Sequence, residues 1–132
     1  MAIPGLHLTQ IGKEDFLLEP ARGLDVSDHE RLLERIAERL LGARASRLYY
    51  DLSKQAIIDP VYYSWLNKLA RTAQAINVKM VCVQMQPTAA FSLVQFAHEK
   101  PLFETALDIS GWQSNLSVSP RQQGGLVGAA RR

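Results

Sequence analysis

Residues 47–66 read RLYYDLSKQAIIDPVYYSWL and join two different kinds of element. The first six residues, RLYYDL, form a short run with aromatic side chains that is typical of a strand. The helix expected next begins at Asp59-Pro60, because Asp is a favoured N-cap and Pro suits the first helical position. We therefore expect a strand, a polar connection and then a helix, which is a unit of α/β folds.

Downstream of this unit, the pattern continues to alternate between helices and strands. The expected helix carries a single buried stripe formed by Tyr62, Trp65, Leu66, Leu69, Ala73 and Ile76. Residues 78–85, VKMVCVQM, are rich in β-branched residues and predict a central strand. A third helix should start at Pro87, and a last strand should cover residues 105–109. The inward-facing residues expected in the third helix are Ala90, Leu93, Val94 and Ala97.

Upstream, two short strands and one strong helix are expected. The strands cover residues 6–11 and 15–19. Ser27 and Glu30 have the S-x-x-E spacing of a capping box, which predicts a helix that runs to Gly42. The resulting order β-β-α-β-α-β-α-β predicts an α/β fold with a mixed β-sheet and helices packed mainly on one face.

Composition limits the possible function classes. The 132 residues form one domain, expected over residues 1–112, and the Ser-, Gln- and Gly-rich residues 113–132 predict a flexible C-terminal tail. The net charge of +2 depends on three arginines in that tail, since residues 1–112 contain twelve basic and thirteen acidic residues. We therefore expect no nucleic-acid or membrane partner, and a cytoplasmic protein without a secretory signal.

No pattern typical of an enzyme, a cofactor site or a metal site is present. Phosphate-binding glycine motifs are missing from the sequence, and His7, His29 and His98 lack metal-ligand spacing. Cys82 lies within the expected central strand, which favours a buried packing role over a reactive thiol. The sequence therefore predicts a protein that is not an enzyme and needs no cofactor.

One cluster of polar residues stands at the expected carboxyl end of a strand, where α/β proteins often place their sites. It comprises Asp51, Ser53, Lys54, Gln55 and Asp59, and the following helix adds Tyr63, Ser64 and Asn67 on its polar face. A turn and a helix cap would explain most of these residues equally well.

The stretch from Asp51 to Val94 resembles the STAS domain of bacterial anti-sigma-factor antagonists, and it is most similar to the stressosome branch. The resemblance depends on colinear segments with conserved spacing rather than on one specific motif. These segments are Tyr50-Asp51-Leu52-Ser53, Ile57-Ile58-Asp59, Val78-Lys79-Met80-Val81, Gln86-Pro87-Thr88-Ala89-Ala90 and Ser92-Leu93-Val94. They follow the family pattern D-[IL]-[ST], five residues, then D-[ST], except at the last position.

The resemblance implies a regulatory protein–protein interaction module that works by partner switching. Its partners would be a GHKL-type serine kinase or an anti-sigma factor, and other STAS proteins in a stressosome. Phosphorylation of the residue after the second Asp would add charge and expel the partner. The partner-binding residues implied for this chain are Ser53, Lys54, Gln55, Asp59, Pro60, Tyr63, Ser64 and Asn67.

Pro60 stands where the family carries the phosphorylated Ser or Thr, and proline has no hydroxyl. The chain could be a permanently unphosphorylated binder, it could use Ser53, Ser64 or Ser92 instead, or it could have lost this role. Ser53 and Ser92 are the candidate phosphorylation sites.

Two further expectations concern function. Trp112 could cover a sheet edge or form part of a contact surface. Tyr63 could be exposed and anchor an interface, or it could have a core or rim role. The alternative to a partner-binding module is a ligand-sensing STAS domain that binds a nucleotide or small metabolite between the sheet and the second helix.

Overall fold

The computed structural model describes residues 3–22, 24–27, 29–97, 100–107 and 109. Its strands are β1 (Leu6–Gln10), β2 (Asp15–Pro20), β3 (Arg47–Asp51), β4 (Lys79–Val83) and β5 (Glu104–Ala106). Its helices are α1 (His29–Gly42), α2 (Pro60–Ala75) and α3 (Pro87–Val94). This order confirms the predicted β-β-α-β-α-β-α-β arrangement.

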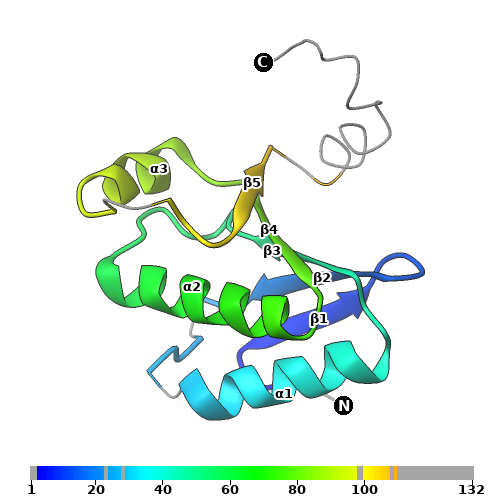
Figure 1. Cartoon of the computed structure of the whole chain (residues 1–132). Coiled ribbons are helices and arrows are strands. Elements are labelled where there is room, and N and C mark those ends of the chain that lie inside the picture. The colour runs from blue at the N-terminus through cyan, green and yellow to red at the C-terminus, as the bar shows by residue number, and fades with distance from the viewer. Residues whose placement is uncertain (1–2, 23, 28, 98–99, 108, 110–132) are drawn as a thin grey trace, which may run out of the picture.

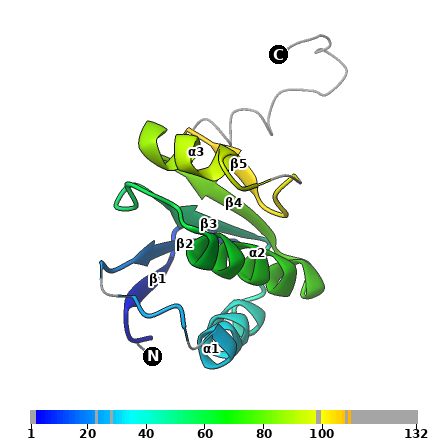
Figure 2. The same ribbon diagram turned by 90° about the vertical axis from the view of Figure 1, so that its left-hand side faces the viewer.

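The strands form one mixed sheet in the order β1-β2-β3-β4-β5. β1 pairs antiparallel with β2, whereas β2, β3, β4 and β5 run parallel to one another. Parallel neighbours need a crossover, and each of the three helices supplies one. Figure 1 shows α1 and α2 against the same face of the sheet, and Figure 2 shows α3 beside β4 and β5. The predicted mixed sheet with helices mainly on one face is therefore confirmed.

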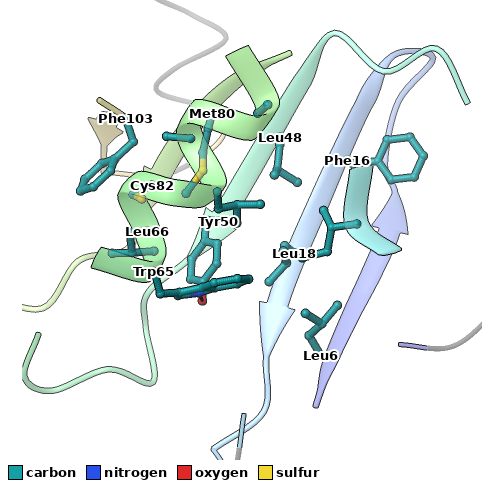
Figure 3. Packing of buried hydrophobic residues seen from close by; sticks show 14 of the residues in the cluster. Leu6, Phe16, Leu18, Leu48, Tyr50, Trp65, Leu66, Met80, Cys82 and Phe103 are labelled. Atoms are coloured by element: carbon teal, nitrogen blue, oxygen red, sulfur yellow. Dashed lines mark hydrogen bonds between the residues drawn. The ribbon is translucent and has the colours of Figure 1, made fainter. Parts of the chain in front are cut away.

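The main core lies between the sheet and the two helices α1 and α2. Figure 3 shows the part of it where Trp65 and Leu66 of α2 meet the strands. Side chains alternate along each strand, so every second residue of the sheet faces the helices. The buried strand residues on this face are Leu6, Phe16, Leu18, Leu48, Tyr50, Met80 and Cys82. Trp65, Leu66 and Leu69 of α2 meet them and are almost completely buried. The packing role predicted for Cys82 is confirmed, because its side chain is fully buried.

A second, smaller cluster lies on the opposite face of the sheet. Tyr49, Val81 and Val83 are buried there, and Leu17 and Ala106 pack against them. The central strands are thus apolar on both faces, as is usual for parallel strands in an α/β fold.

The start of α2 follows the prediction. Asp59 has an extended backbone (φ −91°, ψ 172°), and its carboxylate accepts a hydrogen bond from the Tyr62 N–H at 2.8 Å. Pro60 occupies the first helical position, where the missing N–H costs nothing. Beyond the helix, Asn77 has a left-handed backbone (φ 63°), which matches the turn expected there.

Three local predictions are wrong. The last strand, expected over residues 105–109, is the shorter β5 and ends at Ala106. Ser27 does not cap α1, because the helix begins at His29 and the Ser27 hydroxyl donates to the Asp25 carboxylate. In α3 the buried residue is Ala89, whereas Ala90 and Val94, which were expected to face inward, are exposed.

The expected domain boundary at residue 112, Trp112 and the tail over residues 113–132 lie outside the described residues. Within the part that the structure describes, no helix combines the length and apolar character needed to cross a membrane.

Candidate functional site at the carboxyl ends of β3 and β4

The connection from β3 to α2, residues 52–59, forms a turn that is fixed at its start by Asp51. The Asp51 carboxylate accepts a hydrogen bond from the Ser53 N–H at 2.8 Å, and the Gln55 N–H donates to the Leu52 C=O at 3.0 Å. Ser53 and Lys54 are exposed, whereas Ile58 is completely buried. The loop therefore presents polar side chains at its tip while Ile58 anchors it in the core.

Three side chains in and just before α3 hold the backbone of this loop. Their hydrogen bonds run from Gln86 Nε2 to the Ser53 C=O (2.5 Å), from Thr88 Oγ1 to the Ala56 C=O (2.5 Å), and from the Ile58 N–H to Ser92 Oγ (3.0 Å). The Ser92 hydroxyl in turn donates to the Ala89 C=O at 2.8 Å. The loop and α3 are thus joined at three points and form one structural unit.

The predicted site residues fall into two groups. Five of them lie together in the loop and at the start of α2, namely Ser53, Lys54, Gln55, Asp59 and Pro60. The other three, Tyr63, Ser64 and Asn67, lie further along α2 and are half-buried.

Tyr63 and Asn67 make contacts inside the protein. The Tyr63 ring packs edge-to-face against Phe96 and Phe103, with ring centroids 5.4 and 6.3 Å apart. The Asn67 side-chain oxygen accepts a hydrogen bond from the Leu102 N–H at 3.1 Å. Tyr63 is therefore half-buried rather than exposed, and its side chain packs Phe96 and Phe103 against α2, which agrees with the alternative of a core or rim role.

Sequence reasoning missed a group of exposed apolar side chains beside the loop, which we call the apolar patch. Its members are Ile57 (64% exposed), Val61 (59%), Phe91 (70%) and Val94 (67%). The hydrogen bond between Ile58 and Ser92 places the segment around Ile57 next to the one around Phe91. Large exposed apolar side chains that gather in this way are typical of interaction sites.

Charge at this surface is sparse. α3 carries no charged residue, and the loop contributes Lys54 and Asp59. On α2, Lys68 and Arg71 are exposed, and the Lys68 ammonium lies 3.4 Å from His29 Nδ1. An interface here would therefore depend on apolar contact more than on ion pairs.

A buried hydrogen-bond network lies below the first two turns of α2. The Trp65 indole donates to the Tyr50 hydroxyl at 2.9 Å, and the Tyr50 and Tyr62 hydroxyls are 2.5 Å apart. Burial raises the pKa of Tyr50 well above its usual value and raises the pKa of Tyr62 to about 12. Both phenols are therefore neutral at physiological pH and serve to fix α2 on the sheet.

Among the described residues, no group of three or more His, Cys, Asp or Glu side chains could hold a metal ion. Burial also raises the pKa of the Cys82 thiol, which disfavours the thiolate that reacts with metals and electrophiles.

Comparisons with known proteins support the fold through structure. No protein-family model and no curated protein sequence matches this chain. RsbS of Moorella thermoacetica, carrying a serine-to-glutamate substitution, is similar with a TM-score of 0.70 at 16% identity, over 83% of this chain and 94% of that chain. The anti-sigma factor antagonist SpoIIAA in its unphosphorylated form has a TM-score of 0.62 at 13% identity, over 86% and 98%.

A chain from a structure of the stressosome, described as a signal integration and transduction hub, has a TM-score of 0.59 at 18% identity, over 83% of this chain and 95% of that chain. The chain therefore has the STAS-domain fold of the anti-sigma-factor antagonists. This finding confirms the fold that the resemblance of residues 51–94 implied.

Proposed function

We propose that this chain is a regulatory protein–protein interaction module that acts as an anti-sigma-factor antagonist or stressosome subunit in the cytoplasm. Its partner is a GHKL-type serine kinase or an anti-sigma factor. The docking surface comprises residues 53–60 together with the apolar patch. The observation that carries this proposal is the position of the apolar patch, which adjoins the Asp59-Pro60 step on a STAS fold.

The contacts of the loop suit it for docking. A loop that becomes ordered only when its partner binds weakens the affinity, because ordering it costs conformational entropy. Here Gln86, Thr88 and Ser92 already fix the loop backbone before a partner arrives. The apolar patch can then bury large side chains such as Phe91, and aromatic residues often dominate the energy of interfaces.

Because Pro60 has no hydroxyl, the module cannot be phosphorylated at residue 60. Of the candidate hydroxyls, Ser53 is exposed at the loop tip. Ser92 is half-buried, and its hydroxyl accepts from the Ile58 N–H while it donates to the Ala89 C=O. A kinase would have to break these two bonds before it could modify Ser92, so Ser53 is the more accessible hydroxyl.

The binding test is to purify the tagged chain from its native cells, identify the GHKL-type kinase or anti-sigma factor that accompanies it, and measure the affinity of the purified pair. Phe91→Ala should weaken binding by about tenfold or more, since it removes the most exposed ring of the apolar patch. Leu41→Ala is the matched control, because Leu41 is similarly exposed (57%) but lies on α1. Equal affinities for both variants and the wild type would reject this docking surface.

The phosphorylation test uses the same kinase and ATP with the wild type and Pro60→Ser. The wild type should gain no phosphate at residue 60, and Pro60→Ser should become a substrate, because serine restores the hydroxyl at the first turn of α2. Failure of the kinase to modify Pro60→Ser while binding it normally would contradict the assigned role of this position. Mass spectrometry of the wild-type chain would show whether Ser53 or Ser92 carries the phosphate instead.

Side-chain packing counts against the alternative of a ligand between the sheet and the middle of α2. Trp65, Leu66 and Leu69 fill that space and are almost completely buried. Hollows of about 380 and 300 Å³ lie along α1, and one of about 380 Å³ lies beside the last turns of α2 and the start of β4, away from these three side chains. A thermal-shift screen with nucleotides would test the alternative, since a ligand of the folded state raises the unfolding temperature.

A further inference from the structure

Among the described residues, the helices cover only one face of the sheet. α1 and α2 pack on the face that carries the main core, and Ala89 of α3 belongs to the same core. Side chains alternate between the two faces along each strand, so Tyr49, Val81 and Val83 stand on the other face. We call this the second face, and no described helix lies on it.

Tyr49 is nevertheless completely buried on the second face, and so is Val81. Side chains stand roughly perpendicular to a sheet, so a residue on a bare face keeps its outer end in water. The Tyr49 hydroxyl, at that outer end, is buried as well. Leu17 and Val81 lie directly beside Tyr49 on the neighbouring strands, and their shorter side chains cannot enclose its outer end. Complete burial of Tyr49 therefore requires a further segment that lies over the second face.

The shielded part of the second face is small. His7 and Thr9 of β1 stand on the same face and are exposed, and so is Glu19 near the end of β2. Leu17 of β2 is half-buried and marks the limit of the shielded part. A short segment that crosses β5, β4 and β3 would account for this pattern.

The chain after β5 leads onto the second face. Ile109, three residues after the strand ends, packs against the cluster that contains Tyr49. Three more residues span up to about 10 Å when extended, and β3 lies two strand spacings, roughly 10 Å, from β5. Residue 112 can therefore reach Tyr49. It is Trp112, the only aromatic residue after Phe103, and a tryptophan ring offers a large apolar area for covering a neighbour.

We propose that residues 110–115 cross the second face of the sheet, with the Trp112 ring seated on Tyr49 and Val81. These residues lie outside the described part of the chain, and the proposal rests on the burial of Tyr49 and the position of Ile109. The chain thus closes its own second face, which is unavailable to a partner while the segment stays in place. The docking surface lies at the carboxyl ends of β3 and β4 and is a separate part of the molecule.

Nuclear magnetic resonance of the full chain tests the contact directly. The indole protons of Trp112 should show nuclear Overhauser contacts to the Val81 methyl groups and to the Tyr49 ring. In a mixture of isotope-labelled and unlabelled chains, these contacts should stay within one chain. Their absence would overturn the proposal. Contacts found only between labelled and unlabelled chains would also overturn it, because a second copy would then cover the face.

Replacement of Trp112 measures what the contact contributes to stability. Trp112→Ala should lower the midpoint of thermal unfolding by about 5 °C or more, because a large apolar area returns to water. Leu126→Ala is the matched control, since it removes a large apolar side chain from the same end of the chain but beyond residues 110–115. The control should keep the wild-type midpoint. Equal midpoints for the two variants, whether lowered or unchanged, would contradict the assigned position of Trp112.

Limited proteolysis of the wild type gives a readout that needs no variant. Chymotrypsin prefers tryptophan to leucine, and both Trp112 and Leu126 lie in the last part of the sequence. A covered Trp112 should nevertheless be cut later than Leu126, because a protease needs an accessible segment. Cleavage after Trp112 before Leu126 in the folded protein would refute the cover.

Discussion

Replacement of Ser92 by alanine tests whether α3 fixes the loop before β3 is joined to α2. The Ser92 hydroxyl accepts a hydrogen bond from the Ile58 N–H at 3.0 Å and donates to the Ala89 C=O at 2.8 Å. Ile58 is completely buried, so its N–H has no access to water once the hydroxyl is gone. Ser92→Ala therefore leaves a buried donor without an acceptor.

The expected loss of stability follows from the burial of the Ile58 N–H. A buried donor that loses its partner destabilises a protein by about 1–3 kcal/mol. For a domain of this size, 1 kcal/mol lowers the midpoint of thermal unfolding by about 4 °C. Thr88→Ala is the matched control on the same helix, since Thr88 bonds the carbonyl of the exposed Ala56, which water can reach. We expect the control to cost less than about 0.5 kcal/mol.

Urea denaturation followed by circular dichroism would measure both variants against the wild type. The free energy of unfolding should fall by at least about 1 kcal/mol for Ser92→Ala and stay near the wild-type value for Thr88→Ala. This result would support the stabilising role of the hydrogen bond between the Ile58 N–H and Ser92. Equal effects of the two substitutions would refute the reasoning, because burial of the Ile58 N–H is the only difference on which it depends. Loss of stability should be accompanied by faster amide exchange at Ile58.

Three further predictions concern the start of α2 and the core. Asp59→Ala should lower the free energy of unfolding by about 1 kcal/mol, because the Tyr62 N–H loses its cap. Asp59→Asn should retain most of the wild-type stability, because the amide oxygen can still accept from this N–H, and urea denaturation of both variants checks this. Since burial raises the pKa of Tyr62 to about 12, its contribution to stability should be complete below pH 10 and should be lost as the pH rises toward 12, by up to roughly 3 kcal/mol. Unfolding curves from pH 8 to pH 11.5 test this, and an alkaline loss in Tyr62→Phe as large as in the wild type would contradict it. Cys82 should react with a thiol reagent at least about 100-fold more slowly in the native protein than in urea, because burial raises its pKa; rapid native labelling would show that the strand opens.

Much of the fold could be predicted because its elements carry clear local signals. The run of residues 78–85 contains β4, and the Asp59-Pro60 step marks the start of α2 to the residue. Ser27 shows the limit of such signals, because the nearby Asp25 offers its hydroxyl a competing acceptor.

α3 shows a second limit. It has eight residues and no charged side chain, so its own apolar residues occur on more than one side of the helix. No single apolar stripe therefore identifies its inner face. The contacts of Ser92 and Ala89 with the rest of the protein decide its orientation, and these contacts turn Val94 outward.

The candidate site was predictable only in part for a related reason. The polar residues of the loop are consecutive in sequence, so the sequence alone could group Ser53 with Asp59. Ile57 and Phe91 lie 34 residues apart, and the crossover from β4 through α3 brings their segments together. Of the adjacent Ile57 and Ile58, only Ile58 is buried, and its N–H is the one that bonds to the Ser92 hydroxyl. The sequence alone does not distinguish the two side chains.

The loss of a hydroxyl at Pro60 does not disturb the surface around it. The first helical position needs no N–H, the cap belongs to Asp59, and the loop backbone is held by α3. Each feature that shapes the docking surface is thus independent of the side chain at residue 60. Under the proposed function, a chain of this design can keep its binding surface while it gives up the modification that would release the partner. Regulation would then have to come from the partner, from Ser53, or from the amount of the chain itself.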